Sequence, residues 1–530
     1  MGASYDYIIV GAGSAGCVLA NRLSADPASR VLLLEAGPAD TAKEIHIPAG
    51  FTKLAKTAVD WDYATMPQSA LDNRAVHWPR GKVLGGSSSI NAQMYIRGHA
   101  LDYDSWPQLG APGWSYAEVL PYFRRSERNV RGAGDYHGGD GLLDISEQRE
   151  PNPLTRRFLA AAQEVGLPRN DDFNGPVLEG AGLAQVTQRR GQRRSAAAAF
   201  LRPAAKRANL TIATDALATR IAFEGRRAIG VAYRTQGRDE TATGGREIIL
   251  CGGAVNSPQL LMLSGIGPPS ELEWHGVKRI HDLPGVGQNL QDHLAVPVLA
   301  DISSTESLMD AETLGNLLRY LVLRTGKLTS NVGEAAAFLR SLPDLAAPDL
   351  ELVFVPALFE GEPGVPPTRH GITIFVVLLQ PHSSGAIRLT SADPAAKPMI
   401  EANYLADVRD RAPILHGLAL VRRMLAAPAF AGVITGKVEP PTSAASEDDL
   451  MAHVRQRAQT LYHPVGTCRM GQGPDAVVDP TLRVYGVAGL RVVDASVIPR
   501  ITRGHTHAPA MMIAERAADL IVAAARKGGD

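Results

Sequence analysis

Three glycines near the N-terminus, Gly11, Gly13 and Gly16, have the spacing of a loop that binds the phosphates of a dinucleotide. They follow an apolar segment, residues 7–10, which is predicted to be a β-strand. A helix is predicted to begin near Ser14, and the unpaired N–H groups at its start would face the phosphates. The chemistry that this arrangement indicates is the binding of a redox dinucleotide.

An acidic residue, Glu35, ends the next apolar segment, residues 31–34, and completes a strand–helix–strand pattern. Its carboxylate would accept hydrogen bonds from both hydroxyls of an adenosine ribose. Gly11 permits the tight turn, Gly13 lets the backbone approach a pyrophosphate, and Gly16 lets the helix pack closely on the sheet. The alternative is an ordinary glycine-rich turn, and it does not account for the acidic residue.

The composition is that of a globular protein with more than one domain. The chain has 530 residues, of which 45% are hydrophobic and 20% charged, and its formal net charge is zero. A single core rarely grows to this length, so two or more domains are expected. Zero net charge gives no indication of a surface for nucleic acid or for an anionic membrane. No apolar run approaches the roughly 20 residues of an integral membrane segment.

The start of the chain and its cysteines predict a cytoplasmic protein. The first residues lead directly into the strand at 7–10, without a basic and an apolar segment before it, so no signal peptide is expected. Cys17, Cys251 and Cys468 are odd in number and widely spaced, which fits a reducing compartment. Peripheral association with a membrane stays open.

The order of the predicted elements indicates an α/β domain that is interrupted by a domain of another type. After the first unit, strands are expected at 210–213, 218–223, 228–233 and 247–250, and glycine-rich residues 252–258 lead into a helix at 259–263. Residues 295–455 differ, with strands at 350–355 and 372–379 and a helix at 412–425. The first style returns at the end of the chain, with a strand at 490–493 and a helix at 508–525.

Two further glycine-rich segments carry a resemblance to a known family. Residues 81–91 read GKVLGGSSSIN, and residues 253–261 read GAVNSPQLL. Both resemble, at every defined position, the signature patterns of the glucose–methanol–choline (GMC) oxidoreductases. Residues 462–467, YHPVGT, and 492–496, VVDAS, are also similar to that family. The resemblance covers nearly the whole chain and points to its bacterial branch of choline and alcohol dehydrogenases.

The resemblance implies an α/β fold with a doubly wound, Rossmann-like FAD-binding domain. A second domain, of the α+β class, would bind the substrate with an antiparallel sheet covered by helices. We expect residues 1–155, 196–294 and 456–530 to form the FAD-binding domain. Residues 156–195 and 295–455 would then form the substrate-binding domain.

The resemblance also implies that the cofactor is FAD, a choice that the strand–helix–strand pattern leaves open. Besides Gly11, Gly13, Gly16 and Glu35, it assigns to the cofactor site Ser14, Ala15, Ala36, Trp61, Val83, Gly85, Gly86, Ser87, Asn91, Ala92, Thr219, Asp494, Ala495, His507 and Pro509. Some relatives attach FAD through a histidine just before the asparagine of the first signature. Here that residue is Ile90, so non-covalent binding is expected.

Oxidation of an alcohol requires a base for the hydroxyl proton while a hydride leaves the carbon, and histidine is the usual base near neutral pH. The sequence has 14 histidines, and the resemblance selects two of them. His463 falls at the family's general-base position. His505 falls at the position of its partner, which would hold the substrate oxygen and align the carbon. Repulsion between the rings is expected to keep at most one of them protonated.

Three neighbouring possibilities concern other histidines. His507 replaces an asparagine that lies near the flavin in relatives, and it could contact either the flavin or the backbone. His293 is expected to have a structural role. A zinc site made by His463, His505 and His507 is disfavoured, because no carboxylate flanks the latter two and nearby arginines would repel a cation. No metal is predicted.

The predicted function is FAD-dependent oxidation of a primary alcohol, polyol or sugar to the aldehyde or ketone, with proton abstraction at a histidine and hydride transfer to flavin N5. The partners would be this small alcohol and an electron acceptor. A dehydrogenase would use a quinone or a dye and an oxidase would use O₂, and no motif decides between them. A non-redox flavoprotein of the hydroxynitrile-lyase type is a less favoured alternative. Choline would need a carboxylate or an aromatic cage, which the sequence does not place.

Overall fold

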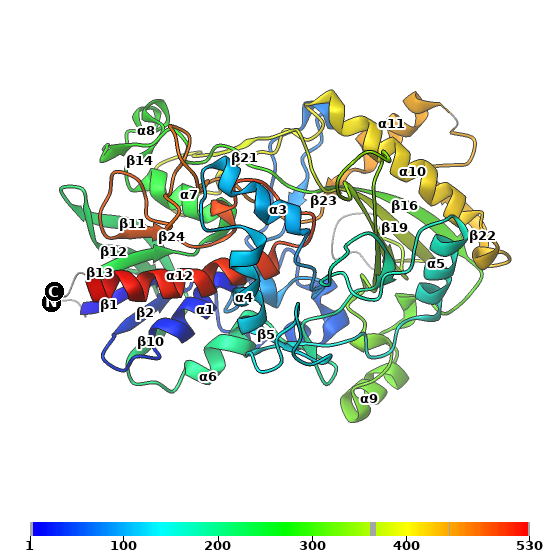
Figure 1. Cartoon of the computed structure of the whole chain (residues 1–530), viewed down its shortest axis with the longest axis horizontal. Helices are drawn as coiled ribbons and strands as arrows, with labels where there is room; N and C mark the ends of the chain where they lie inside the picture. Colours follow the sequence, from blue (N-terminus) through cyan, green and yellow to red (C-terminus); the bar gives the residue numbers. More distant parts are fainter. Residues whose placement is uncertain (1–3, 361–366, 445, 528–530) are drawn as a thin grey trace.

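Two seven-stranded sheets of different type organise the chain. The computed structural model describes residues 4–360, 367–444 and 446–527. Figure 1 shows the two sheets at opposite ends of the long axis, with the first and last parts of the chain in one of them. This arrangement confirms the predicted α/β fold class with a second sheet of another type.

The first sheet joins parallel strands from distant parts of the sequence. Its order is β10-β2-β1-β13-β12-β11, and β24 also pairs with β13. These strands are β1 (Ser4–Val10), β2 (Val31–Leu34), β10 (Leu210–Ala213), β11 (Ala216–Glu224), β12 (Arg227–Thr235), β13 (Arg238–Leu250) and β24 (Leu490–Val492). Strands β11 and β12 are antiparallel to their neighbours, and the other pairs are parallel. Helices α1 (Ser14–Leu23) and α12 (His507–Lys527) pack beside each other on this sheet (Figure 1).

The carboxyl ends of three parallel strands meet at one edge of the first sheet. The N–H of Cys251, after β13, donates to the carbonyl of Val10 at the end of β1. The N–H of Val493, after β24, donates to the carbonyl of Leu250. Ligands of open α/β sheets bind outside such an edge. The three segments that follow these strands are therefore the ones that can form a site.

The second sheet is antiparallel throughout, with the order β22-β16-β19-β18-β17-β7 and β23 beside β16. Its strands are β7 (Gly180–Leu183), β16 (Leu294–Ile302), β17 (Ala335–Leu339), β18 (Leu350–Val355), β19 (Gly371–Leu378), β22 (Ile434–Glu439) and β23 (Gln459–Thr460). Helices α5 (Pro153–Glu164), α10 (Arg411–Leu425) and α11 (Glu447–Arg457) cover its outer face (Figure 1).

Side chains of β18 alternate between the two faces of the second sheet. Leu352 and Phe354 join the core under the helices, where the ring of Phe354 stacks on Phe158 of α5 at a centroid distance of 4.9 Å. Val353 and Val355 belong to a second apolar cluster on the inner face. The inner face is the one that looks toward the first sheet.

The remaining elements are short and connect or cover the two sheets. The helices are α2 (Lys43–His46), α3 (Ala100–Ser105), α4 (Tyr116–Ser126), α6 (Arg202–Ala204), α7 (Gly253–Leu263), α8 (Pro269–Trp274) and α9 (Leu314–Leu323). The strand pairs are β3 (Tyr63–Ala64) with β4 (His77–Trp78), β5 (Glu127–Asn129) with β6 (Leu143–Ile145), β8 (Gln188–Arg189) with β9 (Gln192–Arg193), β14 (Ile266–Gly267) with β15 (His281–Asp282), and β20 (Ala386–Arg388) with β21 (Met399–Glu401). None of the helices in the described ranges is long and apolar enough to cross a membrane.

Two helices begin earlier than the sequence predicts. Helix α7 begins at Gly253 rather than at residue 259, because the Asp494 carboxylate accepts a hydrogen bond from the Gly253 N–H and stabilises the first turn. Helix α12 begins at His507, which places this residue in the first turn. Two elements cross the predicted domain boundaries: α5 spans residue 155, and β23 joins the second sheet. We retain the boundaries as a proposal for the two folding units.

The close contact between α1 and the turn before it predicts an unusual effect of alanine. A Cβ atom at Gly16 would lie 1.9 Å from the carbonyl oxygen of Gly11. Gly16→Ala should therefore destabilise the protein by about 1–3 kcal/mol, although alanine normally favours a helix. Thermal unfolding measures the change. Gly134→Ala is the control, because its Cβ would meet nothing within 4 Å; equal melting temperatures for both variants would contradict the prediction.

Candidate active site

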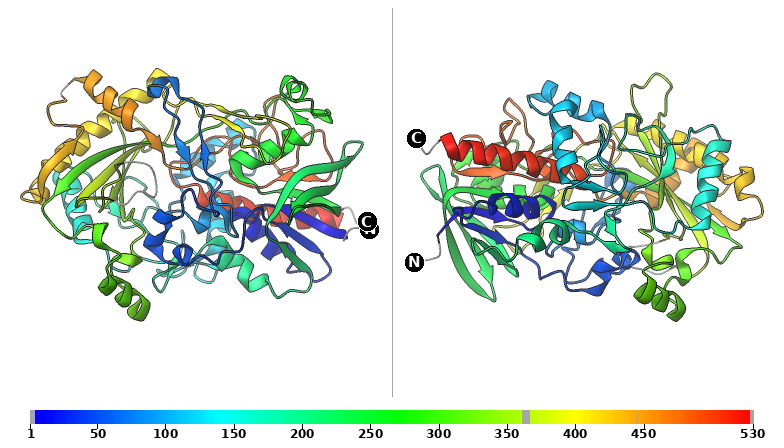
Figure 2. Two further views of the ribbon diagram at one scale, coloured as in Figure 1. Left: turned by 180° about the vertical axis from the view of Figure 1, so that it is seen from behind. Right: turned by 60° about the horizontal axis from the view of Figure 1, so that its bottom comes forward.

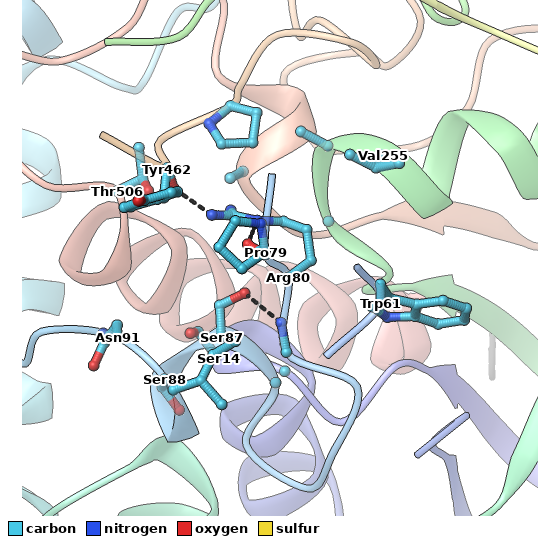
Figure 3. Close-up of a pocket in the computed structure, with 18 of the residues that line it drawn as sticks. Ser14, Trp61, Pro79, Arg80, Ser87, Ser88, Asn91, Val255, Tyr462 and Thr506 are labelled. Atoms are coloured by element: carbon cyan, nitrogen blue, oxygen red, sulfur yellow. Dashed lines mark hydrogen bonds between the residues drawn. The ribbon is translucent and has the colours of Figure 1, made fainter. Parts of the chain in front are cut away.

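A cavity of about 390 Å³ lies between the carboxyl edge of the first sheet and the inner face of the second. It is the place where most of the residues predicted to bind a cofactor or to act in catalysis come together. Its wall includes Gly11, Gly13, Ser14, Ala15, Glu35, Ala36, Trp61, Gly86, Ser87, Asn91, Ala92, His463, Asp494, Ala495, His505 and His507. Figure 3 shows part of this wall, with Ser14, Ser87 and Asn91 on one side and Tyr462 and Thr506 opposite.

Five predicted cofactor residues do not line the cavity. Gly16 packs against the Gly11 carbonyl, as expected from its role in helix packing, and Gly85 donates its N–H to the Ala12 carbonyl. Val83 is buried in a small apolar cluster. The Thr219 hydroxyl donates across the hairpin to Ala232, and the wall is formed by the residues before it. Pro509 does not line the cavity, whereas the next residue of α12, Ala510, does.

The turn after β1 leaves space that no protein atom fills. Gly11 has φ +104° and a Cβ there would lie 2.5 Å from the Cys251 carbonyl oxygen, so only glycine fits. A Cβ at Gly13, by contrast, would meet nothing closer than 3.9 Å. The cradle next to Gly13 is therefore open toward the cavity at the start of α1. N–H groups at such a helix start bind phosphate.

Glu35 lies at the end of this cradle, with both carboxylate oxygens directed to backbone N–H groups. Oε2 accepts from Ala12 at 2.9 Å and Oε1 accepts from Gly37 at 2.9 Å. Burial nevertheless raises the pKa of Glu35 to about 7. Each oxygen retains a lone pair, so the carboxylate can accept further hydrogen bonds from the hydroxyls of a ribose.

Two loops close the cavity around this cradle. A Cβ at Gly86 would lie 2.7 Å from the Cα of Gly13, so the segment 81–91 touches the turn after β1 directly. The Ser87 hydroxyl accepts a hydrogen bond from the Gly81 N–H at 3.1 Å (Figure 3). On the other side, Asp494 accepts from the Ser257 hydroxyl at 2.6 Å and ties α7 to the segment after β24.

Two buried polar side chains, His507 at the cavity wall and Arg193 behind it, have nitrogen atoms without a protein partner in the described residues. His507 Nδ1 lies 2.9 Å from the Ser14 hydroxyl, whereas its Nε2 is unpaired, and burial lowers the pKa of His507 to about 4. Arg193 donates to Asn91 Oδ1 at 2.7 Å, but its Nη2 is unpaired and no carboxylate faces it. Burial alone lowers the pKa of Arg193 to about 9.

Such atoms are costly to bury without a partner, so they fit a site whose ligand supplies acceptors and donors. Sequence reasoning singled out His507 but missed Arg193. A signal was present, because Arg193 comes shortly before a run of four alanines, 196–199, which is typical of a buried segment.

His463 is held by a second histidine that the sequence analysis considered structural. His293 Nε2 lies 3.1 Å from the Leu379 carbonyl oxygen, and its Nδ1 lies 3.0 Å from His463 Nδ1. A carbonyl only accepts, so Nε2 of His293 carries the proton and its Nδ1 has the lone pair. His463 Nδ1 must then donate to His293. This leaves a lone pair on the Nε2 atom of His463.

Both rings in this pair are neutral. Burial lowers the pKa of His293 to about 3, with a smaller contribution from His505. Burial, followed by the charges of His505, His293 and Arg80, holds the pKa of His463 well below its ordinary value.

Backbone hydrogen bonds fix the loop that carries His463. The Asp292 carboxylate accepts from the His463 N–H at 2.7 Å and from the Thr460 hydroxyl at 2.6 Å. Arg80 donates to the Tyr462 carbonyl at 2.7 Å (Figure 3). Tyr462 needs such support because its φ is +68°, which a tyrosine rarely adopts.

His505 has a carboxylate partner that sequence reasoning missed. Its Nε2 lies 3.1 Å and 3.3 Å from the two carboxylate oxygens of Glu351, which is fully buried on β18. The rings of His505 and His463 are 4.8 Å apart. The sequence held a signal, because Glu351 is the one charged residue in an otherwise apolar strand. Glu351 therefore supplies from a distant strand the carboxylate that the sequence around His505 lacks.

A group of apolar side chains lies in the wall beside a few polar ones, which include Tyr462 and Thr506 next to the two histidines. The apolar side chains are those of Phe51, Met94, Val332, Val353, Val355, Phe359, Phe375 and Leu461. Two carboxylates line the cavity, Glu35 and Asp494, and both belong to the edge of the first sheet. The histidine end can therefore receive an apolar group and present it to two imidazoles.

Comparisons with known proteins show which family has this fold and site. Two family models, each described as GMC oxidoreductase, match residues 5–295 and 381–514. An alcohol dehydrogenase [acceptor] from Pseudomonas putida is 46% identical over 98% of this chain and 96% of its own. The mitochondrial choline dehydrogenase of Homo sapiens is 43% identical over 98% of this chain and 89% of its own. A solved formate oxidase of Aspergillus oryzae, described for its FAD modification, is 30% identical over 99% of each chain, with a TM-score of 0.92.

Proposed function

The chain belongs to the GMC oxidoreductase family, whose members are FAD-binding flavoproteins, and we propose that it oxidises apolar alcohols to aldehydes or ketones. The family and the cofactor predicted from the two glycine-rich signatures are thereby confirmed. The observation that carries the proposal is the pair of imidazoles, His463 and His505, at the apolar end of the cofactor cavity.

The cavity fits FAD by the groups that it leaves without partners. The open cradle at Gly13 and the start of α1 would hold the pyrophosphate, and Glu35 would accept the ribose hydroxyls. The unpaired Nε2 of His507 would find a partner on the flavin, and Arg193 would hold Asn91 at the wall. Ile90 lies at the wall and offers no atom for a covalent bond, so we propose that FAD is held non-covalently. When bound, the flavin supplies the acceptor for a hydride.

The two histidines would divide the work on the substrate hydroxyl. Nε2 of His463 has a lone pair and would accept the hydroxyl proton. A single hydroxyl can donate to only one ring, so His505 would hold the same oxygen as a donor. Glu351 lies behind His505 and would hold that ring in place through its Nε2 atom. This arrangement would fix the carbon in position for hydride transfer.

The wall supports an apolar alcohol rather than choline or a sugar. The lining carboxylates, Glu35 and Asp494, belong to the opposite edge, so a quaternary ammonium would have no carboxylate beside it and mostly phenylalanine rings as partners. A sugar would need polar partners for each hydroxyl, whereas Val353, Val355 and Phe375 offer none. We further propose a cytoplasmic location, since Cys17, Cys251 and Cys468 are all unpaired.

Anaerobic mixing of the purified yellow protein with a panel of alcohols tests this function. We expect bleaching of the flavin absorbance by aliphatic or aryl primary alcohols, with faster rates as the apolar chain grows, and weak bleaching by choline or glucose. Admission of air then separates an oxidase, which recovers quickly, from a dehydrogenase, which needs a quinone or dye. Efficient bleaching by choline alone would contradict the apolar substrate, and no bleaching by any alcohol would contradict the oxidation itself.

Removal of the proposed base gives the second test. His463→Ala should lower the rate of flavin reduction by about 100-fold or more, the usual size of a general-base contribution. Because the pKa of His463 is held well below its ordinary value, the wild-type rate should stay constant through neutral pH and fall only in acid. Stopped-flow reduction at several pH values measures both effects.

Matched variants separate the base from its surroundings. His416→Ala changes an exposed histidine of α10 and should leave the rate unchanged. His293→Asn retains an acceptor for the Nδ1–H of His463 and should keep much of the rate, whereas His293→Leu should lose it. Parental rates in His463→Ala would show that another group takes the proton.

The affinity for FAD should depend on pH through Glu35. Ribose hydroxyls donate to the ionised carboxylate, so FAD binds the deprotonated form of a group whose pKa is about 7 in the empty site. Affinity should therefore fall as the pH decreases below that value, by up to about tenfold per pH unit. Fluorescence titration of the apoprotein with FAD measures it. Glu35→Gln should bind FAD more weakly at alkaline pH and lose this pH dependence. If the affinity of the variant still changed with pH as in the wild type, Glu35 would not be the group responsible.

A further inference from the structure

Helix α9 (Leu314–Leu323) turns its apolar side away from the protein. Leu314, Leu318, Leu321 and Val322 are 71%, 53%, 54% and 77% exposed, and Leu317 is exposed as well. These positions follow the spacing i, i+3, i+4, i+7 and i+8, which forms a single stripe along a helix. In a globular protein such a stripe normally faces the core. An exposed apolar stripe therefore indicates a surface that binds a partner.

The helix is held firmly in this orientation. The Thr313 hydroxyl caps its first turn by accepting from the Asn316 N–H. On the inward side, Tyr320 is buried beside Ala311 and Leu328, and its hydroxyl donates to the Gly191 carbonyl at 3.1 Å. Figure 1 and both views of Figure 2 show α9 projecting from the body of the molecule.

Basic side chains border the stripe where α9 ends. The Arg324 guanidinium lies over the ring of Tyr320, 4.7 Å from its centroid. The β8–β9 hairpin abuts the same point, since a Cβ at Gly191 would lie 2.7 Å from the Arg324 carbonyl oxygen. The hairpin carries the exposed Arg190. Within the described residues no carboxylate forms an ion pair with Arg190 or Arg324, whereas the nearby Arg189 and Arg319 pair with Asp144 and Glu150.

A short segment connects the buried side of α9 with the apolar end of the active-site cavity. Ile47 and Ala49 pack against the buried side of α9, in the cluster of Tyr320. The same short segment continues into the turn Pro48–Lys53, whose Phe51 lines the cavity. One segment therefore contacts the underside of α9 and the substrate end of the cavity.

We propose that α9 is an interfacial anchor by which the protein docks on an anionic lipid bilayer. An apolar stripe bordered by unpaired arginines is the pattern of a helix that lies in the headgroup region. A second copy of the chain is a poorer fit, because a ten-residue helix is about 15 Å long and a stable dimer buries roughly 800 Å² per partner. Docking would place the cavity next to a phase in which apolar alcohols dissolve.

Co-sedimentation of the full-length, FAD-loaded protein with vesicles tests the proposal. The probe is an equimolar mixture of phosphatidylcholine and phosphatidylglycerol. We expect the wild type to bind, and L318E/L321E to lower its partition coefficient by at least about tenfold. Binding should weaken in added salt and on vesicles of phosphatidylcholine alone, because the arginines then lose their partners. The assay needs no turnover, so its outcome is independent of the proposed substrate.

Three controls make the result specific to α9. W274E removes another exposed apolar side chain, 84% exposed on α8, and should bind like the wild type. L318Q/L321Q removes apolar surface without adding charge and should also bind weakly. The flavin absorbance and melting temperature of both α9 variants should match the wild type, since these side chains are exposed. Absent wild-type binding, unchanged binding of both variants, or a concentration-dependent dimer lost in them would each overturn the proposal.

Discussion

Direct contact between backbone segments, with no side chains between them, creates the cavity on which every other feature depends. Gly11 lies under the Cys251 carbonyl, and Gly86 lies against Gly13, at separations that any Cβ would violate. These contacts bring together the ends of β1 and β13 and the segment 81–91. Because the segments touch there, the open space beside Gly13 is enclosed and remains free for a cofactor. The shape of this end is therefore set by glycine rather than by side-chain packing.

The other end of the cavity is governed by burial of polar groups with fixed partners. His463 is supported by a neutral ring, His293, and its loop by the buried carboxylate of Asp292. His505 is supported by a carboxylate, Glu351. Two similar imidazoles thus differ in what lies behind them, and this difference would assign them opposite roles toward one hydroxyl. In a cavity of low dielectric such partners determine protonation more strongly than the residue type does.

The two sheets contribute separate properties to the same site. The first sheet supplies the cofactor cradle and the segments after its parallel strands. The second supplies the apolar wall through Val353 and Val355, while Leu352 and Phe354 of the same strand pack under the helices. The surface is also uneven, although the net charge of the chain is zero. The apolar stripe on α9 and the arginines beside it lie on one face of the molecule.

The sequence by itself determined the strand–helix–strand unit, its acidic residue and the two family signatures, because each depends on residues close together in the chain. It also singled out His463 and His505, which line one cavity. Only the tertiary structure joined them to His293 and Glu351, which are 170 and 154 residues away along the chain. It also revealed that Arg193 is buried without a carboxylate and that α9 faces outward. These contacts and orientations depend on which strands pair and which faces pack together. Long-range contacts determine that pairing and packing, and they cannot be read from the local sequence.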